Sequence, residues 1–159
     1  MPTPTYTSLA NVTLGTTAAS VTFSSIPATY RDLILVYDWT STSAASFYIR
    51  LNGDSGSNYT RVYMGAISAA ASGTESGTGW NGLSLSAGNE RQIGTLQIMD
   101  YSATDKHKTA LNRANQASPY VIADAYRWAN TAAVTSASFT MASGTFSAGS
   151  TFNLYGVIA

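Results

Sequence analysis

Charge is scarce in this sequence. Charged residues make up 10% of the 159 positions, with eight Lys and Arg against eight Asp and Glu, whereas a typical soluble domain is about one quarter charged. A chain without net charge has no long-range field that would attract a phosphate backbone or an anionic lipid surface. The composition therefore argues against nucleic acid and membrane as partners, and weak self-repulsion favours association with other proteins.

Cysteine is absent, and so is any long apolar run. Without thiols the chain can form no disulfide, no thiolate metal site and no cysteine nucleophile. The N-terminal residues 1–5 lack the basic and apolar regions of a signal peptide, and no run reaches the ~18 apolar residues of a membrane span. We expect a complete cytoplasmic product whose stability comes from packing or from oligomer contacts.

Helical periodicity is also missing, because no apolar stripe extends beyond one turn. Ser, Thr, Asn and Gly fill the polar positions, and Ser and Asn compete with the helix backbone for hydrogen bonds. Short apolar runs bounded by Gly, Pro, Asn or Ser predict an all-β chain of about nine or ten strands, arranged as an antiparallel, jelly-roll-like β-sandwich. The runs lie at 21–26, 32–40, 47–51, 59–64, 83–85, 93–98, 108–115, 120–128, 134–141 and 151–158.

Two of these runs give specific expectations. The segment from Asp32 to Thr40 is almost continuously apolar, which is typical of a strand covered on both faces in the middle of a sheet. In the segment 120–128, Tyr120, Ile122, Asp124, Tyr126 and Trp128 should share one face. Val121, Ala123 and Ala125 should occupy the other.

The N-terminal residues 1–10 are expected to form an extended arm outside a single sandwich domain of residues 11–159. Pro2 and Pro4 remove backbone donors, so this segment is a poor start for a paired strand. Tyr6 and Leu9 would complete the arm's contact with a partner. From Tyr6 to Leu14 the apolar residues recur with a short period, which breaks at Gly15 and resumes at Val21, and this pattern predicts two strands joined by a turn.

Residues 66–82 are rich in Ala, Ser, Gly and Thr and are expected to form a long surface loop. Within it, Trp80 has no core pattern around it. It could anchor an interface or stack on a sugar ring, or it could fold back over the open end of the sandwich. Trp80, Asn81 and Glu75 are therefore the candidate surface and ligand-binding residues.

The segment 52–58 places oxygen side chains at alternate positions, as calcium loops do, but Asp54 is its one carboxylate. A hydrogen-bonded turn after Asn52 and Gly53 is the favoured interpretation.

Catalytic chemistry has little support in this sequence. His107, the single histidine, could act as a base oriented by Asp100 or Asp105, but it lies between two lysines in a polar stretch, and no Gly-x-Ser-x-Gly turn supplies a nucleophile. Glycoside cleavage needs two paired carboxylates, and the acids are scattered along the chain. The sequence predicts no catalytic residue, no metal site and no cofactor. The acids in question are Asp38, Asp54, Glu75, Glu90, Asp100, Asp105 and Asp124.

Three stretches carry a resemblance: Leu51–Tyr59 (LNGDSGSNY), Ile98–Thr109 (IMDYSATDKHKT) and Ser150–Val157 (STFNLYGV). They resemble, in this order within residues 26–158, segments of small virion structural proteins of tailed bacteriophages. Those proteins are β-sandwich or jelly-roll modules that serve as capsid decoration (cement) proteins, head fibres or tail-fibre tips. No active-site residues carry over from them.

The resemblance implies a non-enzymatic capsid decoration protein on the virion surface, made in the host cytoplasm. It would form a homotrimer and stabilise the phage head by binding the major capsid protein. The lack of a long N-terminal shaft favours a compact module over a stand-alone fibre. The alternative is a head-fibre or tail-fibre tip that binds a host receptor or surface glycan. A small glycosidase or esterase is the third hypothesis.

Overall fold

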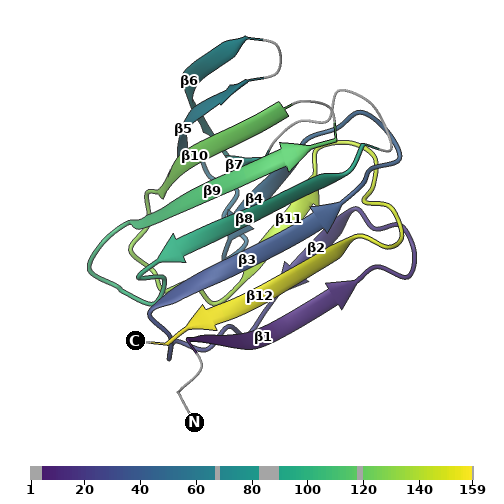
Figure 1. Ribbon diagram of the computed structural model, residues 1–159. Helices are drawn as coiled ribbons and strands as arrows, with labels where there is room; N and C mark the ends of the chain where they lie inside the picture. Colours follow the sequence, from purple (N-terminus) through teal and green to yellow (C-terminus); the bar gives the residue numbers. More distant parts are fainter. Residues whose placement is uncertain (1–4, 67–68, 83–89, 118–119, 159) are drawn as a thin grey trace.

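The computed structural model describes residues 5–66, 69–82, 90–117 and 120–158, which form two antiparallel sheets packed face to face (Figure 1). The larger sheet has eight strands in the spatial order β1 (Tyr6–Thr13), β12 (Thr151–Val157), β3 (Asp32–Trp39), β8 (Gln92–Met99), β9 (Lys108–Gln116), β10 (Tyr120–Trp128), β5 (Tyr59–Ala66) and β6 (Ala70–Gly77). The smaller sheet has four, in the order β2 (Ser20–Phe23), β11 (Ala137–Met141), β4 (Phe47–Leu51) and β7 (Trp80–Asn81).

The predicted all-β, antiparallel sandwich is confirmed, with twelve strands in the described residues in place of nine or ten. The added strands, β6 and β7, lie in the segment 66–82 that was expected to be a loop. Where apolar and polar residues alternate, the predicted strands are present. In β10, for example, Ile122, Asp124, Tyr126 and Trp128 are buried while Val121 and its alternate neighbours are exposed.

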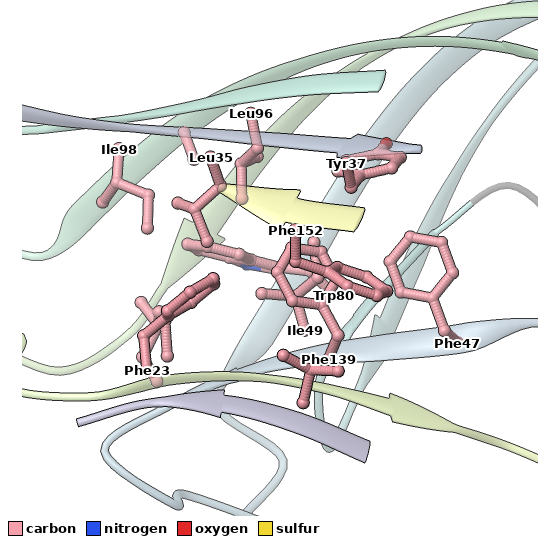
Figure 2. Close-up of a cluster of buried hydrophobic side chains, with 14 of the residues drawn as sticks. Phe23, Leu35, Tyr37, Phe47, Ile49, Trp80, Leu96, Ile98, Phe139 and Phe152 are labelled. Atoms are coloured by element: carbon pink, nitrogen blue, oxygen red, sulfur yellow. The ribbon is translucent and has the colours of Figure 1, made fainter. Parts of the chain in front are cut away.

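An aromatic layer fills the space between the sheets, and Figure 2 shows side chains from both sheets meeting there. The Trp39 ring meets Phe47 and Phe146 edge-on, with centroids 5.2 and 5.3 Å apart. Phe139 of the smaller sheet packs on Phe152 of the larger one at 5.1 Å. Such rings contribute large buried areas and favour edge-to-face geometry, so this layer defines how the two sheets are aligned.

β3 lies inside the larger sheet, between β12 and β8, as expected, but the smaller sheet covers only one of its faces. Leu33, Leu35 and Tyr37 are buried against the smaller sheet, whereas Ile34 and Val36 are half-buried on the opposite face. The expectation of two covered faces was wrong because the described residues form two layers, and no third layer lies over β3.

The expected arm of residues 1–10 is corrected for residues Tyr6 to Ala10, which belong to β1. Tyr6 pairs with Val157 at the edge of the larger sheet, and a bulge separates Ser8 from Ala10. Every residue of β1 carries a backbone N–H, so this segment can join the ladder of β12. Leu9 is half-buried and packs against the core, and Pro2 and Pro4 lie outside the described residues.

The expected loop of residues 66–82 is also corrected. Ala70–Gly77 forms β6, which pairs with β5 over eight residues, and Trp80–Asn81 forms β7. Ala, Ser, Gly and Thr give no apolar alternation, yet their backbones pair as well as any others, so the pattern that normally indicates a strand was absent. Residues 67 and 68 and the predicted strand at 83–85 lie outside the described residues.

Replacing Gly94 by alanine is expected to lower the free energy of unfolding by about 1–3 kcal/mol, because the new methyl group would overpack the core. Gly94 lies opposite Tyr37 in the ladder of β3 and β8, and an added Cβ would lie 2.2 Å from the Tyr37 ring. Urea unfolding of Gly94→Ala measures this loss. Gly15→Ala is the control, since no atom lies within 4 Å of its Cβ position. Equal stability of both variants would contradict this account of the core.

Candidate binding surface

The larger sheet has an outer face, which points away from the smaller sheet. Successive side chains of a strand point to opposite faces, so half of the side chains in these strands lie on the outer face. Among the described residues, all the exposed large hydrophobic side chains are there, including Met64 at 68% and Val121 at 62% exposure. They are Tyr6, Val62, Met64, Ile93, Leu111 and Val121.

Strand register brings several of these side chains together. Leu111 lies opposite Ala125, which in turn lies opposite Val62. In the next row, Ala123 separates Arg113 from Met64. Directly opposed residues of neighbouring antiparallel strands have Cβ atoms about 5 Å apart, so the apolar side chains of β9, β10 and β5 form a continuous patch.

The outer face is hollowed. One hollow of about 890 Å³ extends from Tyr6 on β1 to Met64 on β5 and passes over Val36 and Leu111. A second, of about 650 Å³, adjoins it and is lined by Ile93 and Val121, among others. Both volumes fall in the range of about 300–1,000 Å³ that is usual for binding sites.

A single cation, Arg113, lines both hollows. Its side chain is exposed, and within the described residues it forms no ion pair. By contrast, Arg91 at the rim of this face holds Asp38 through two hydrogen bonds of 2.6 and 2.7 Å. The outer face is therefore an apolar surface with one uncompensated positive charge near its centre.

Sequence reasoning missed this surface, although a signal for it was present. The alternation in β10 left Val121, Ala123 and Ala125 for the face opposite the core. A strand whose second face is also apolar indicates either a second covering layer or an exposed binding face.

The three predicted surface residues of the 66–82 segment are all buried or half-buried. Trp80 is 0% exposed and stacks on Tyr126 with ring centroids 5.2 Å apart, while its Nε1 donates to the Arg127 carbonyl at 3.1 Å. Of the two roles considered for Trp80, the structure shows the one in which it folds onto the sandwich. Asn81 is half-buried and donates to Glu75 Oε2 at 2.8 Å.

Glu75 belongs to a polar network that crosses the inner face of β6, β5 and β10. Arg61 Nη1 donates to Glu75 at 3.1 Å, and Arg61 Nε donates to Asp124 Oδ1 at 2.7 Å. Asn112 donates from Nδ2 to Asp124 Oδ2 at 2.7 Å, and its Oδ1 accepts a 2.8 Å hydrogen bond from the Tyr37 hydroxyl. Burial raises the pKa of Tyr37, so its hydroxyl stays protonated and donates.

Replacing Asp124 by asparagine should lower the free energy of unfolding by about 3–5 kcal/mol, because Arg61 would keep a buried charge without its buried partner. The side chains of Arg61 and Asp124 are 8% and 0% exposed. Chemical denaturation measures the change. The matched variant Glu75→Gln removes a carboxylate that is 39% exposed from the same arginine and should cost no more than about 1 kcal/mol. Equal losses would show that burial does not set the strength of these pairs.

The segment 52–58 is a hydrogen-bonded turn. Both carboxylate oxygens of Asp54 are engaged, Oδ1 by the Gly56 amide at 2.8 Å and Oδ2 by Asn58 Nδ2 at 2.9 Å and Trp128 Nε1 at 2.7 Å. Within the described residues, no three His, Cys, Asp or Glu side chains are placed to hold a metal ion. The Asp54 carboxylate therefore holds this turn and joins it to Trp128 of β10.

The first two stretches that carry the phage resemblance meet at one end of the sandwich, around residues 129–136. Asn52 holds this segment through hydrogen bonds to the Ala133 carbonyl and from the Thr135 amide. The buried Lys108 donates from Nζ to the carbonyls of Ala103, Lys106 and Thr131 at 2.7, 3.1 and 3.2 Å. The third stretch contains β12 in the core. These motif residues therefore have structural roles.

The contacts of His107 give the hydrolase hypothesis no support. Its ring is exposed, and Nδ1 lies 3.2 and 2.9 Å from the guanidinium nitrogens of Arg127. Asp100 instead faces Lys106 at 3.2 Å. No carboxylate orients the imidazole in the part of the chain that the structure describes.

Comparisons with known proteins show the fold alone. No protein-family model matches the chain, and neither does any curated protein. Among solved structures, an exo-inulinase from Aspergillus awamori matches 96% of this chain with a TM-score of 0.50 and 14% identity. This chain covers 29% of the inulinase chain, so it corresponds to less than a third of that protein.

No described helix is long and apolar enough to cross a membrane.

Two galectins give weaker matches. LEC-6 of Caenorhabditis elegans has a TM-score of 0.38 and 12% identity over 94% of this chain and 96% of its own. A tetrameric galectin from a Cinachyrella sponge has a TM-score of 0.36 and 11% identity over 88% of this chain and 99% of its own. The class defined by the fold and the surface is an all-β antiparallel sandwich with one apolar face that no other described element covers.

Replacing Asp54 by asparagine should destabilise the protein by about 1–2 kcal/mol at neutral pH, through loss of charge-assisted hydrogen bonds. Burial disfavours the ionised carboxyl, but the hydrogen bonds from Trp128, Asn58 and Gly56 outweigh it, so the pKa of Asp54 is lowered.

A lowered folded-state pKa gives stability that is present above the unfolded-state pKa and lost as pH falls through the folded one. The gap between wild type and Asp54→Asn should therefore close below about pH 4, as thermal melts from pH 7 to pH 2 would show. Asp105→Asn, in an exposed turn, is the control. A gap that persists at pH 2 would refute the assignment to the carboxylate.

Proposed function

We propose that this chain is a non-enzymatic decoration protein of a tailed-phage head, and that it binds the head through the outer face of its larger sheet. The observation that supports a docking role is the collection of exposed large hydrophobic side chains on that face. The virion setting rests on the resemblance of residues 51–59, 98–109 and 150–157 to phage structural proteins.

The apolar character of the outer face favours a protein partner. Contiguous exposed apolar patches mark interaction surfaces in soluble proteins, because burying them releases about 25 cal/mol per Å². Met64, Val62 and Leu111 project from neighbouring strands whose backbones are fully paired. The patch is therefore rigid, and docking on it costs little backbone entropy.

Arg113 defines the charge of the partner. An arginine without an ion pair near the centre of an apolar surface favours a carboxylate on the opposing protein, and the pair would strengthen as water is excluded. The proposed partner is the major capsid protein, which would present an acidic side chain among apolar ones at this position. A homotrimer on the capsid, as the resemblance implies, stays a prediction.

The alternative is a fibre tip that binds a host receptor or glycan. It relied on an exposed Trp80. Trp80 lies in the core and cannot stack on a sugar without unfolding. An inulinase shares the fold, but at 14% identity over 29% of its length this supports no saccharide ligand here. The decoration function is the better supported of the two.

Replacing Leu111 by aspartate should weaken binding to decoration-free heads by tenfold or more, which corresponds to about 1.4 kcal/mol. The heads are assembled from the major capsid protein of the same genome, and co-sedimentation measures bound copies. Thr22→Asp, exposed on the smaller sheet, is the matched control and should bind like wild type.

Arg113→Glu should also lose binding, while Arg113→Lys should retain most of it. Unchanged binding by Leu111→Asp in a folded protein would rule out the outer face. A wild-type protein that does not bind heads but binds glycans on an array would favour the fibre-tip function.

A further inference from the structure

The four sheet edges of this protein are not equally protected. An exposed edge strand can pair with a strand of another chain, and natural proteins prevent this with short edges, bulges, prolines or charged side chains. β2 has four residues and β7 has two, so both smaller-sheet edges are short. β1 contains a bulge between Ser8 and Ala10 and follows two prolines in the sequence.

β6 has none of these protective features. It is eight residues long, pairs with β5 in unbroken register from Ala70 to Gly77, and contains neither proline nor lysine. Figure 1 shows it at the free end of the larger sheet, next to β5. Within the described residues, β5 is its one ladder partner, and five of its eight residues are exposed.

The one charged residue of β6 does not guard the edge either. Glu75 lies on the inner face, where Arg61 and Asn81 hold its carboxylate at 3.1 and 2.8 Å. The ion pair with Arg61 reduces the repulsion that this carboxylate would present to an approaching strand. The Arg61 contact also holds β6 against β5, so the edge of β6 keeps the extended shape that a second strand needs for pairing.

We propose that β6 is a self-association edge, at which two copies of this chain pair antiparallel about a twofold axis. A twofold interface requires a self-complementary surface. Ala, Ser, Gly and Thr side chains along β6 offer no bulk or free charge that would clash with their own copies. The zero net charge of the chain adds little repulsion between copies.

Such pairing would have a geometric consequence for the outer face. In a sheet that continues through a twofold axis perpendicular to it, the same face of each copy points to the same side. Val62 and Met64 lie on β5, next to β6, so the two apolar patches would become neighbours across the junction. The dimer would present one surface of twice the size.

The absence of cysteine makes the pairing testable by cross-linking. Single-cysteine variants Ser72→Cys, Thr74→Cys and Ser76→Cys place a thiol at exposed positions two residues apart on β6. Under mild oxidation, one of them should form a disulfide dimer efficiently, the one nearest the axis. The yield should fall at the others, because each two-residue step separates the thiols by roughly 13 Å. Thr22→Cys on the β2 edge should give little dimer.

Sedimentation velocity of the wild-type chain tests the same contact without cross-links. We expect a monomer–dimer equilibrium that shifts with concentration, and its loss in the Ser72→Lys, Ser76→Lys double variant, with an unchanged melting temperature. Thr22→Lys should dimerise like wild type, and so should Leu111→Asp, which separates this contact from docking on heads.

Three results would overturn the proposal: a wild-type chain that stays monomeric at millimolar concentration, association that survives the two lysines, or cross-linking no stronger at β6 than at Thr22.

Discussion

The smaller sheet covers one face of the larger sheet and leaves the other face bare, and most features of this molecule depend on that constraint. Rings from both sheets meet in one layer, with Phe139 of the smaller sheet against Phe152 of the larger at 5.1 Å. Interdigitated rings bury large areas and fix the alignment of the sheets. Most rings lie in this layer, whereas the outer face carries Leu111, Val62 and Met64 together with Tyr6.

Buried polar groups hold the ends and margins that this layer does not reach. Lys108 ties the 101–107 turn to Thr131 through three backbone carbonyls, and Asp54 joins its own turn to Trp128. Arg61 links β5 to β10 and β6 through Asp124 and Glu75. Each group is satisfied by several partners, which is the condition under which burial of a polar group is tolerated.

Alternation predicted the paired strands but not the extent of pairing. The two-residue period in 120–128 correctly placed Ile122, Tyr126 and Trp128 on one face of the strand, and the structure shows that this face is buried. It gave no signal for β6, because Ala, Ser and Gly have no contrast between faces. Strand pairing is a property of the backbone, and a segment of small residues can join a ladder without any apolar pattern. The expectation of an arm, which rested on Pro2 and Pro4, failed from Tyr6 onward because the backbone N–H groups there are free to pair with β12.

The sequence by itself determined the fold class, the near-absence of charge, the lack of thiol chemistry and the turn at Asn52 and Gly53, because each depends on local residue type or spacing. The tertiary structure alone decided the candidate surface. Whether an apolar side chain such as Leu111 or Val121 is buried depends on whether another layer lies above it, and spacing along one strand does not contain that information. Trp80 illustrates the converse, since an isolated tryptophan in a Gly-rich segment became core through contacts with Tyr126 and Tyr59, which are distant in the sequence.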